Sequence, residues 1–345
     1  MIKKSKLLGF VFGLLMSSIV VADSISLNPN HPNEYVVVKG DTLWDISGKF
    51  LQNPWQWPEI WNSNPQIKNP HLIYPGDVIS LINDGSGPRL HIRRKNSRLV
   101  KLSPHTRITK LENAIPTIPI DSIKQFLSRP TIVDKDTLNN SPYIVAFEEE
   151  RIVGGTGHKT YVRKIENEET KNFTIYRDGN TYSDPETGEV LGYEAIYVGD
   201  AQLSETGDPA TLKITRSTRE VLRGDRLLVR HDKDAFDQNF MPKKPTSSIR
   251  ASILAVLNGL TQIGQYNVIT LSKGSDDGVE VGHVLAIIQS GRIIRDTITK
   301  KVENIALPEN TAGYVMVFRT FNQISYALVM NSTSNISVND IVHTP

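Results

Sequence analysis

Histidines are the first side chains to test for catalytic chemistry, because the chain has eight of them and no cysteine. Without cysteine there is no thiolate nucleophile for a cysteine peptidase or an L,D-transpeptidase. A zinc peptidase or amidase would need closely spaced imidazoles, and neither His-x-His nor His-Glu-x-x-His occurs. The positions are scattered: His31, His71, His91, His105, His158, His231, His283 and His343. We therefore predict no catalytic residue, no metal ligand and no cofactor.

Three other patterns have plainer explanations than chemistry. Residues 154–160, GGTGHKT, lack the Gly before Lys of a phosphate loop and follow no βαβ pattern, so we predict a turn between strands. Asp178, Asn180 and Asp184 depart from the calcium-loop spacing and suit a hairpin turn. The run Glu148-Glu149-Glu150 is predicted to be a solvated strand end. Two distant glycosidase carboxylates would leave no sequence signature, so an enzyme stays an alternative.

The stretch 35–82 contains all four tryptophans and has a clear element order. Residues 35–38 are predicted to form a strand, which Gly40-Asp41 ends. Asp41 or Thr42 can cap a helix whose apolar positions lie three or four residues apart, at Leu43, Ile46 and Phe50. A second helix over 57–63 and a second strand over 78–81 complete a βααβ unit.

The strings YVVVKGDTLWDIS and NPQIKNPHLIYPGDVIS, at this separation, resemble a LysM module. The resemblance implies binding of the N-acetylglucosamine-containing glycan of peptidoglycan or chitin, in a shallow groove between two loops. Carried over by motif, the groove residues are Gly40, Asp41, Thr42 and Leu43 on one side, and Asn69, Pro70, Leu72 and Ile73 on the other. Backbone amides with Asp or Thr could bond the acetamido group, and Leu and Ile could cover the sugar ring.

The tryptophans are predicted to serve the module's core more than its ligand. Helical spacing puts Trp44, Trp57 and Trp61 on buried faces, whereas Trp55 is less constrained and could be exposed. One such module should bind weakly, so avidity along a polymer or within an assembly would strengthen attachment.

The N-terminus agrees with a cell-wall ligand. Lys3, Lys4 and Lys6 precede an apolar run, and Val20-Val21-Ala22 fits a cleavage site, so residues 1–22 are predicted to be a signal peptide. An uncleaved anchor is the alternative. Export by this signal implies a periplasmic, cell-wall-associated protein, and an exported protein of this size does not require disulfides.

Composition sets broad bounds on the partners. The chain has 345 residues, 39% hydrophobic and 22% charged, with a formal net charge of +2, which gives no reason to expect nucleic acid. Basic residues cluster over 89–101. This cluster is predicted to be a solvated strand with charged flanks, and electrostatic docking on an anionic polymer or acidic partner is the alternative.

Beyond the LysM-like stretch, short strand-like runs and turn dipeptides dominate. Runs such as YIVAF, NFTIY and TLKIT predict a small barrel or sandwich. The fold class is therefore α+β multidomain, a small βααβ domain followed by mainly β domains. The predicted divisions are 34–82, the LysM domain; 83–142, a linker and short β/α connection with a helix over 120–127; 143–230, a β-rich domain; and 249–345, a β-barrel-like domain.

The C-terminal strings TQIGQYNVITLSKGSDDGVEVGHVLAI and YVMVFRTFNQISYALVM resemble the LysM-containing, type IV pilus secretin-associated proteins of Gram-negative bacteria, in a region similar to the flagellar T protein's barrel. AIPTIPIDSIKQFLSRP and DPETGEVLGYEAIYVGDAQL resemble that family too. The resemblance implies that LysM holds peptidoglycan while the β-rich remainder associates with the outer-membrane secretin ring.

These observations predict a non-enzymatic periplasmic anchor. Its expected partners are peptidoglycan and the type IV pilus secretin or a similar outer-membrane ring, around which the protein could form an oligomer. A wall-lytic enzyme with an unrecognised catalytic domain and a flagellar-type structural protein are the alternatives.

Overall fold

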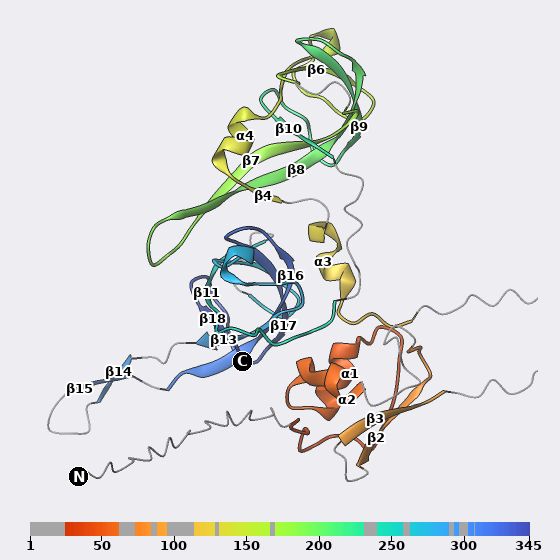
Figure 1. Ribbon diagram of the computed structural model, residues 1–345, viewed down its shortest axis with the longest axis vertical. Coiled ribbons are helices and arrows are strands. Elements are labelled where there is room, and N and C mark those ends of the chain that lie inside the picture. Colours follow the sequence, from red (N-terminus) through yellow and green to blue (C-terminus); the bar gives the residue numbers. More distant parts are fainter. Residues whose placement is uncertain are drawn as a thin grey trace, which may run out of the picture.

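The computed structural model describes residues 25–61, 73–83, 88–94, 114–127, 131–165, 170–230, 240–257, 263–289, 293–296, 303–306 and 308–345. The predicted signal peptide, residues 1–22, lies outside them. Figure 1 shows three units: the N-terminal module, an upper β unit in yellow and green, and a blue C-terminal barrel between them.

The N-terminal module has two short helices packed on a three-stranded antiparallel sheet of order β1-β2-β3. Its elements are β1 (Glu34–Val36), α1 (Leu43–Phe50), the 3-10 turn η1 (Pro54–Gln56), α2 (Trp57–Trp61), β2 (Val78–Asn83) and β3 (Pro88–Arg93). Thr42 is the N-cap of α1, and the apolar face predicted for this helix is buried. β3 was expected in the connecting region, but it continues the module's sheet by pairing with β2 from Asn83↔Pro88 to Val78↔Arg93.

A segment over residues 114–119 leads from the module into α3 (Ile120–Leu127), the helix predicted from its amphipathic pattern. In Figure 1, α3 lies beside the C-terminal barrel, above the N-terminal module. Arg319 of the barrel donates from Nη1 to the carbonyl of Phe126 at 3.2 Å. Helix α3 therefore joins the module to the barrel.

The upper unit is a seven-stranded antiparallel sheet of order β4-β8-β7-β10-β5-β6-β9, and an extra pairing of β8 with β9 closes it on itself. Its elements are β4 (Thr131–Val133), α4 (Lys135–Asn140), β5 (Tyr143–Phe147), the 3-10 turn η3 (Glu148–Glu150), β6 (Lys159–Arg163), β7 (Asn172–Ser183), β8 (Val190–Glu205), β9 (Ala210–Ser217) and β10 (Arg226–Val229). β4 lies before the predicted start of this domain and joins the sheet through Thr131↔Ala195. The 16-residue strand β8 can contact three neighbours because of its length.

The C-terminal unit is a closed barrel of order β11-β12-β17-β16-β13-β18. Its elements are β11 (Arg250–Val256), β12 (Val268–Leu271), the 3-10 turn η4 (Ser275–Asp277), β13 (Val284–Gln289), β16 (Asn310–Thr320), β17 (Ser325–Ser332) and β18 (Ile341–His343). A separate hairpin of β14 (Ile293–Asp296) and β15 (Glu303–Ala306) projects from it in Figure 1. The barrel is filled by aliphatic side chains, including Ile253, Leu285 and Val317.

The upper unit contacts the barrel through its long β7–β8 hairpin. Tyr182 of β7 is buried, and so are Thr270 and Tyr326 of the barrel. At Gly192 of β8, an added Cβ would lie 2.6 Å from Ile132 and 3.4 Å from Ile324 of the barrel. A larger residue there would push the hairpin away from β4 and the barrel.

The same four-residue turn occurs seven times in the described residues and fixes the conformation of those loops. The third residue of each turn has a positive φ, as a type II turn requires, and the fourth donates its N–H to the carbonyl of the first. The side chain of the fourth residue accepts a hydrogen bond from the N–H of the first, at 2.7–3.1 Å. The accepting side chains are Asp41, Asp77, His158, Asp225, Asn267, His283 and Asp340. We call this the acceptor turn.

Candidate glycan-binding site

The first predicted wall of the groove is an acceptor turn followed by the start of α1. Gly40 is exposed with a φ of 101°, a conformation that side chains rarely adopt. The Asp41 carboxylate accepts hydrogen bonds from the Val38 amide at 2.8 Å and from the Tyr35 hydroxyl at 3.0 Å. Asp41 therefore shapes the loop that leads to the helix.

Thr42 and Leu43 also have structural roles in this wall. The Thr42 hydroxyl accepts from the Asp45 amide at 3.1 Å and donates to the Asp45 carboxylate at 2.7 Å, a reciprocal cap of the helix start. Leu43 is fully buried and packs in the module's core.

The second predicted wall is described only at Ile73, because Asn69, Pro70 and Leu72 lie outside the described residues. Ile73 is fully buried in the same core as Leu43. It is followed by the acceptor turn of Tyr74 to Asp77, so matching turns lie at both walls. Among the residues described, the predicted apolar cover for a sugar ring is thus part of the core.

Residues 114–118 lie between the two walls. The amides of Leu43 and Trp44 donate to the carbonyls of Pro116 and Thr117, at 3.0 and 3.2 Å. The amide of Ile115 donates to the carbonyl of Ile73 at 2.9 Å. These contacts join residues more than 40 positions apart, so they leave no local signal in the sequence apart from the apolar string AIPTIPI.

The four tryptophans divide between two environments. Trp57 and Trp61 belong to the core of the N-terminal module. Trp44 and Trp55 belong to a second buried cluster with barrel residues such as Phe318 and Tyr326. Trp55, which could have been exposed, retains only 5% of its accessible surface. The role expected of Trp44 in the module's own core is corrected: its side chain joins the module to the barrel.

Polar contacts reinforce this junction. The Tyr266 hydroxyl of the barrel donates to the Asp45 carboxylate at 3.1 Å, and the Tyr314 hydroxyl donates to the Asn53 side-chain oxygen at 3.4 Å. Burial, followed by the charge and hydrogen bond of Asp45, raises the pKa of Tyr266 to about 12. Beside these contacts, a cleft of about 540 Å³ runs between α1 and the barrel, lined by Asp45, Lys49 and Gln265 among others.

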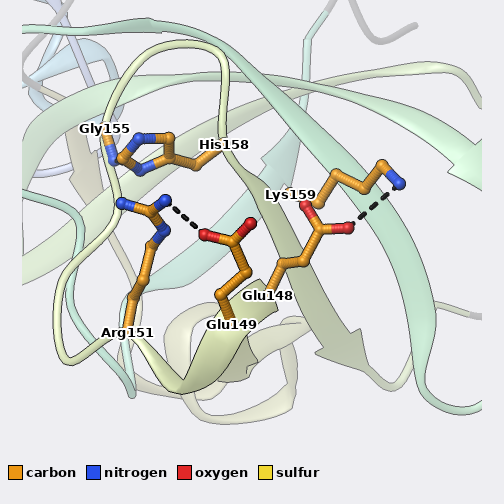
Figure 2. A network of polar contacts seen from close by, with 6 residues as sticks. All are labelled: Glu148, Glu149, Arg151, Gly155, His158 and Lys159. Atoms are coloured by element: carbon orange, nitrogen blue, oxygen red, sulfur yellow. Dashed lines mark hydrogen bonds and ion pairs between the residues drawn. The ribbon is translucent and has the colours of Figure 1, made fainter.

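Within the glycine-rich segment 154–160, residues 155–158 form the predicted turn, and Lys159 and Thr160 begin β6. Figure 2 shows the His158 ring folded back onto Gly155, whose amide donates to Nδ1 at 3.1 Å. The neighbouring Glu148 pairs with Lys159 at 3.2 Å, and Glu149 pairs with Arg151. The run Glu148 to Glu150 forms the 3-10 turn η3. Glu148 and Glu149 make these ion pairs, and Glu150 is exposed to solvent.

Structural contacts also account for Asn180 and Asp184 of the remaining pattern and for His283. Asn180 bonds to the Glu194 carboxylate across the β7–β8 hairpin at 3.0 Å. Asp184 accepts from the amides of Glu186 and Thr187 at the tip of the hairpin. The buried His283 accepts from the Glu280 amide through Nδ1 at 3.1 Å, in another acceptor turn. In the part of the chain that the structure describes, no three His, Asp or Glu side chains gather as a metal site.

The geometry of the N-terminal module agrees with the comparison to known protein families. Residues 35–81 match the LysM domain, a peptidoglycan-binding domain. The chain is also similar to the uncharacterized protein YqbP of Bacillus subtilis (strain 168), with 38% identity over 60 residues. That alignment covers 14% of this chain and 27% of YqbP, so it spans only a small part of either protein.

A search of the described helices for a membrane span gave none with sufficient length and apolar character.

Proposed function

We propose that this protein is a non-enzymatic periplasmic anchor that attaches an envelope assembly to the cell wall. The LysM module would hold peptidoglycan, and the two β units would hold a protein partner, the type IV pilus secretin or a similar outer-membrane ring. The observation that carries the proposal is the packing of Trp44 and Trp55 against the barrel, which fixes a glycan-binding module to a large β surface. A module fixed in this way suits the transfer of load between wall and partner.

The roles of two histidines, His158 and His283, support the non-enzymatic part of the proposal. His158 and His283 both use Nδ1 to accept a backbone hydrogen bond inside an acceptor turn. A ring in this position orients a loop through one nitrogen and is not free to rotate toward a substrate. The choice of the secretin rests on the C-terminal sequence resemblance.

Incubation with purified sacculi tests the wall-binding half of the proposal. We expect the full chain to sediment with the sacculi without releasing soluble muropeptides. Release of muropeptides would favour the wall-lytic alternative. Asp41→Asn, which keeps an acceptor for the Val38 amide, is the matched control for Asp41→Lys, which removes the acceptor and reverses the charge. We expect reduced sedimentation only for Asp41→Lys.

In-cell cross-linking followed by mass spectrometry tests the partner half. Exposed residues of the β units, such as Ile152 in the loop between η3 and β6 with 83% of its surface accessible, are suitable positions for a photo-reactive amino acid. Capture of a secretin would support the proposal, whereas capture of flagellar basal-body proteins would favour the flagellar alternative.

A further inference from the structure

The described parts of the two predicted groove walls, the start of α1 and Ile73, are bridged by the protein's own chain. Residues 114–118, here called the strap, bond to both walls through the three backbone hydrogen bonds at Leu43, Trp44 and Ile73. The Ile115 side chain retains only 4% of its accessible surface and packs in the same core as Leu43 and Ile73.

The strap uses the backbone groups that a glycan would need. The first amides of a helix have no partner within the helix, so Leu43 and Trp44 offer N–H donors at the groove. A carbonyl of an acetamido group is an acceptor that such donors would bind. In the structure, the carbonyls of Pro116 and Thr117 take that place. The strap and a glycan therefore cannot bind these amides at the same time.

The strap also contains a feature that weakens its own hold. The Thr117 hydroxyl is buried, with 1% of the residue accessible, and has no hydrogen-bond partner among the described residues. A buried hydroxyl without a partner is unfavourable because it has lost its hydration. The bound strap is thus held less tightly than a strap with an apolar residue at this position.

The far end of the strap is attached to the barrel. Ile118 is fully buried, and it belongs with Ile123 and Phe126 of α3 to the cluster that contains Phe318 of the barrel. Trp44, at the start of α1, is in the same cluster. Movement of the strap out of the groove would therefore disturb the contact between α3 and the barrel.

We propose that the strap is an internal competitor of the glycan, and that release of the strap couples glycan binding to the barrel face covered by α3. The inference rests on the proposed glycan-binding function. When the strap is bound, the groove is closed, and the apparent affinity falls in proportion to the fraction of open molecules. Coupling between two binding sites is reciprocal. A partner that draws α3 away from its contacts would therefore strengthen glycan binding by the same factor by which bound glycan strengthens binding of that partner.

Two substitutions in the strap should change glycan affinity in opposite directions. Ile115→Ser removes the apolar anchor and is expected to tighten binding of the N-acetylglucosamine tetramer by roughly tenfold, because more molecules are open. Thr117→Val removes the unpaired hydroxyl at nearly constant shape and is expected to weaken binding by roughly fivefold. Lys213→Ala changes an exposed side chain on β9 of the upper unit, outside the strap and the groove, and should leave the affinity unchanged. Calorimetric titration of the full chain measures all three.

Hydrogen exchange at one amide provides an independent readout in the unmodified protein. The Ile115 N–H bonds to the carbonyl of Ile73 only while the strap is in the groove. Addition of the tetramer should therefore accelerate exchange of this proton in a nuclear magnetic resonance experiment. The same readout does not depend on how well the Ile115→Ser variant folds.

The outcomes separate the strap from the glycan function. Tetramer binding with an unchanged Ile115 exchange rate, and equal affinities for the two strap variants, would overturn the strap proposal while leaving glycan binding intact. If folded wild type and folded Ile115→Ser both fail to bind the tetramer and sacculi, the glycan function itself is refuted, and the inference with it.

Discussion

Single side chains at the fourth position of the acceptor turns determine much of this protein's loop structure. Asp, Asn and His occupy the same position, because each has an acceptor that reaches the amide three residues earlier. At His283 the acceptor exists only when Nδ1 carries no proton, so this turn depends on pH. Two of the eight histidines, His158 and His283, are therefore explained as turn residues.

The pH dependence of stability should reveal His283. Its pKa is lowered, first by burial and then by the positive charge of Lys243, while Glu280 opposes the shift. The folded form thus disfavours the proton that the unfolded chain accepts near pH 6.5. The stabilisation is fully present above pH 6.5 and is lost as the pH falls through that value toward the lower folded pKa.

His283→Asn is the matched variant for this prediction, because Asn267 fills the same position in another acceptor turn. We expect His283→Asn to keep the stability at pH 8 within about 1 kcal/mol and to lose less stability between pH 7 and pH 5. Urea unfolding at each pH provides the measurement. If the free energy of unfolding falls equally between pH 7 and pH 5 in the two proteins, His283 does not titrate in this way.

Asp41 allows a second test at the residue scale. Asp41→Ala removes the acceptor for the Val38 amide and the Tyr35 hydroxyl, so we expect a loss of about 0.5–1.5 kcal/mol for each bond that solvent does not replace. Asp41→Asn should recover most of the loss. Thermal unfolding monitored by tryptophan fluorescence would measure it, and equal stability of the three proteins would contradict the role.

At the scale of elements, the tryptophans show how the LysM helices serve two cores. Trp57 and Trp61 are buried in the module's own core. Trp44 and Trp55 instead pack in the cluster that contains barrel residues. An isolated module would expose these two aromatic side chains to water. The module and barrel are therefore expected to stabilise each other.

Substitution of Trp55 tests that expectation. Trp55→Ala should cost about 3–5 kcal/mol, the usual range for deletion of a buried aromatic side chain. Because the loss falls at the junction, calorimetry should show the module unfolding separately from the barrel. Trp57→Ala, within the module's own core, should be similarly destabilising without exposing the barrel face. A single unchanged transition for Trp55→Ala would contradict the coupling.

At the scale of the whole molecule, α3 and the barrel hold the LysM module, and the β7–β8 hairpin holds the upper unit on the barrel. The barrel is thus the centre of the arrangement in Figure 1. In the proposed coupling, binding of a partner to the barrel changes the affinity of the groove for glycan through α3 and the strap. Such a link is consistent with an anchor that attaches to the wall after it joins an assembly.

Alkaline titration tests the junction as a whole. The pKa of Tyr266 is raised to about 12, mainly by burial and then by Asp45, whereas an unfolded tyrosine titrates near pH 10. The stabilisation is full below pH 10 and is lost as the pH rises toward 12. Tyr266→Phe should remove this step, as measured by unfolding at fixed pH values, and persistence of the step in the variant would rule out Tyr266 as its source.

The sequence alone determined the elements of the LysM module and the approximate positions of many strands and turns. The helix start at Asp41 or Thr42, the apolar spacing at Leu43, Ile46 and Phe50, and the bounds of α3 all depend on neighbours within a few residues. The structure then assigns the cap to Thr42. The resemblance to LysM located the groove walls, though Asn69, Pro70 and Leu72 lie outside the described residues and the glycan contacts remain predictions.

Only the tertiary structure decided what lies in that groove and which core each tryptophan joins. The strap reaches Leu43 and Ile73 across long sequence separations, and Trp44 and Trp55 meet barrel strands more than 200 residues away. Such contacts are fixed by shape and buried area, which carry no sequence period. A buried apolar face can be read from a pattern, but the surface that covers it depends on the folding of the whole chain.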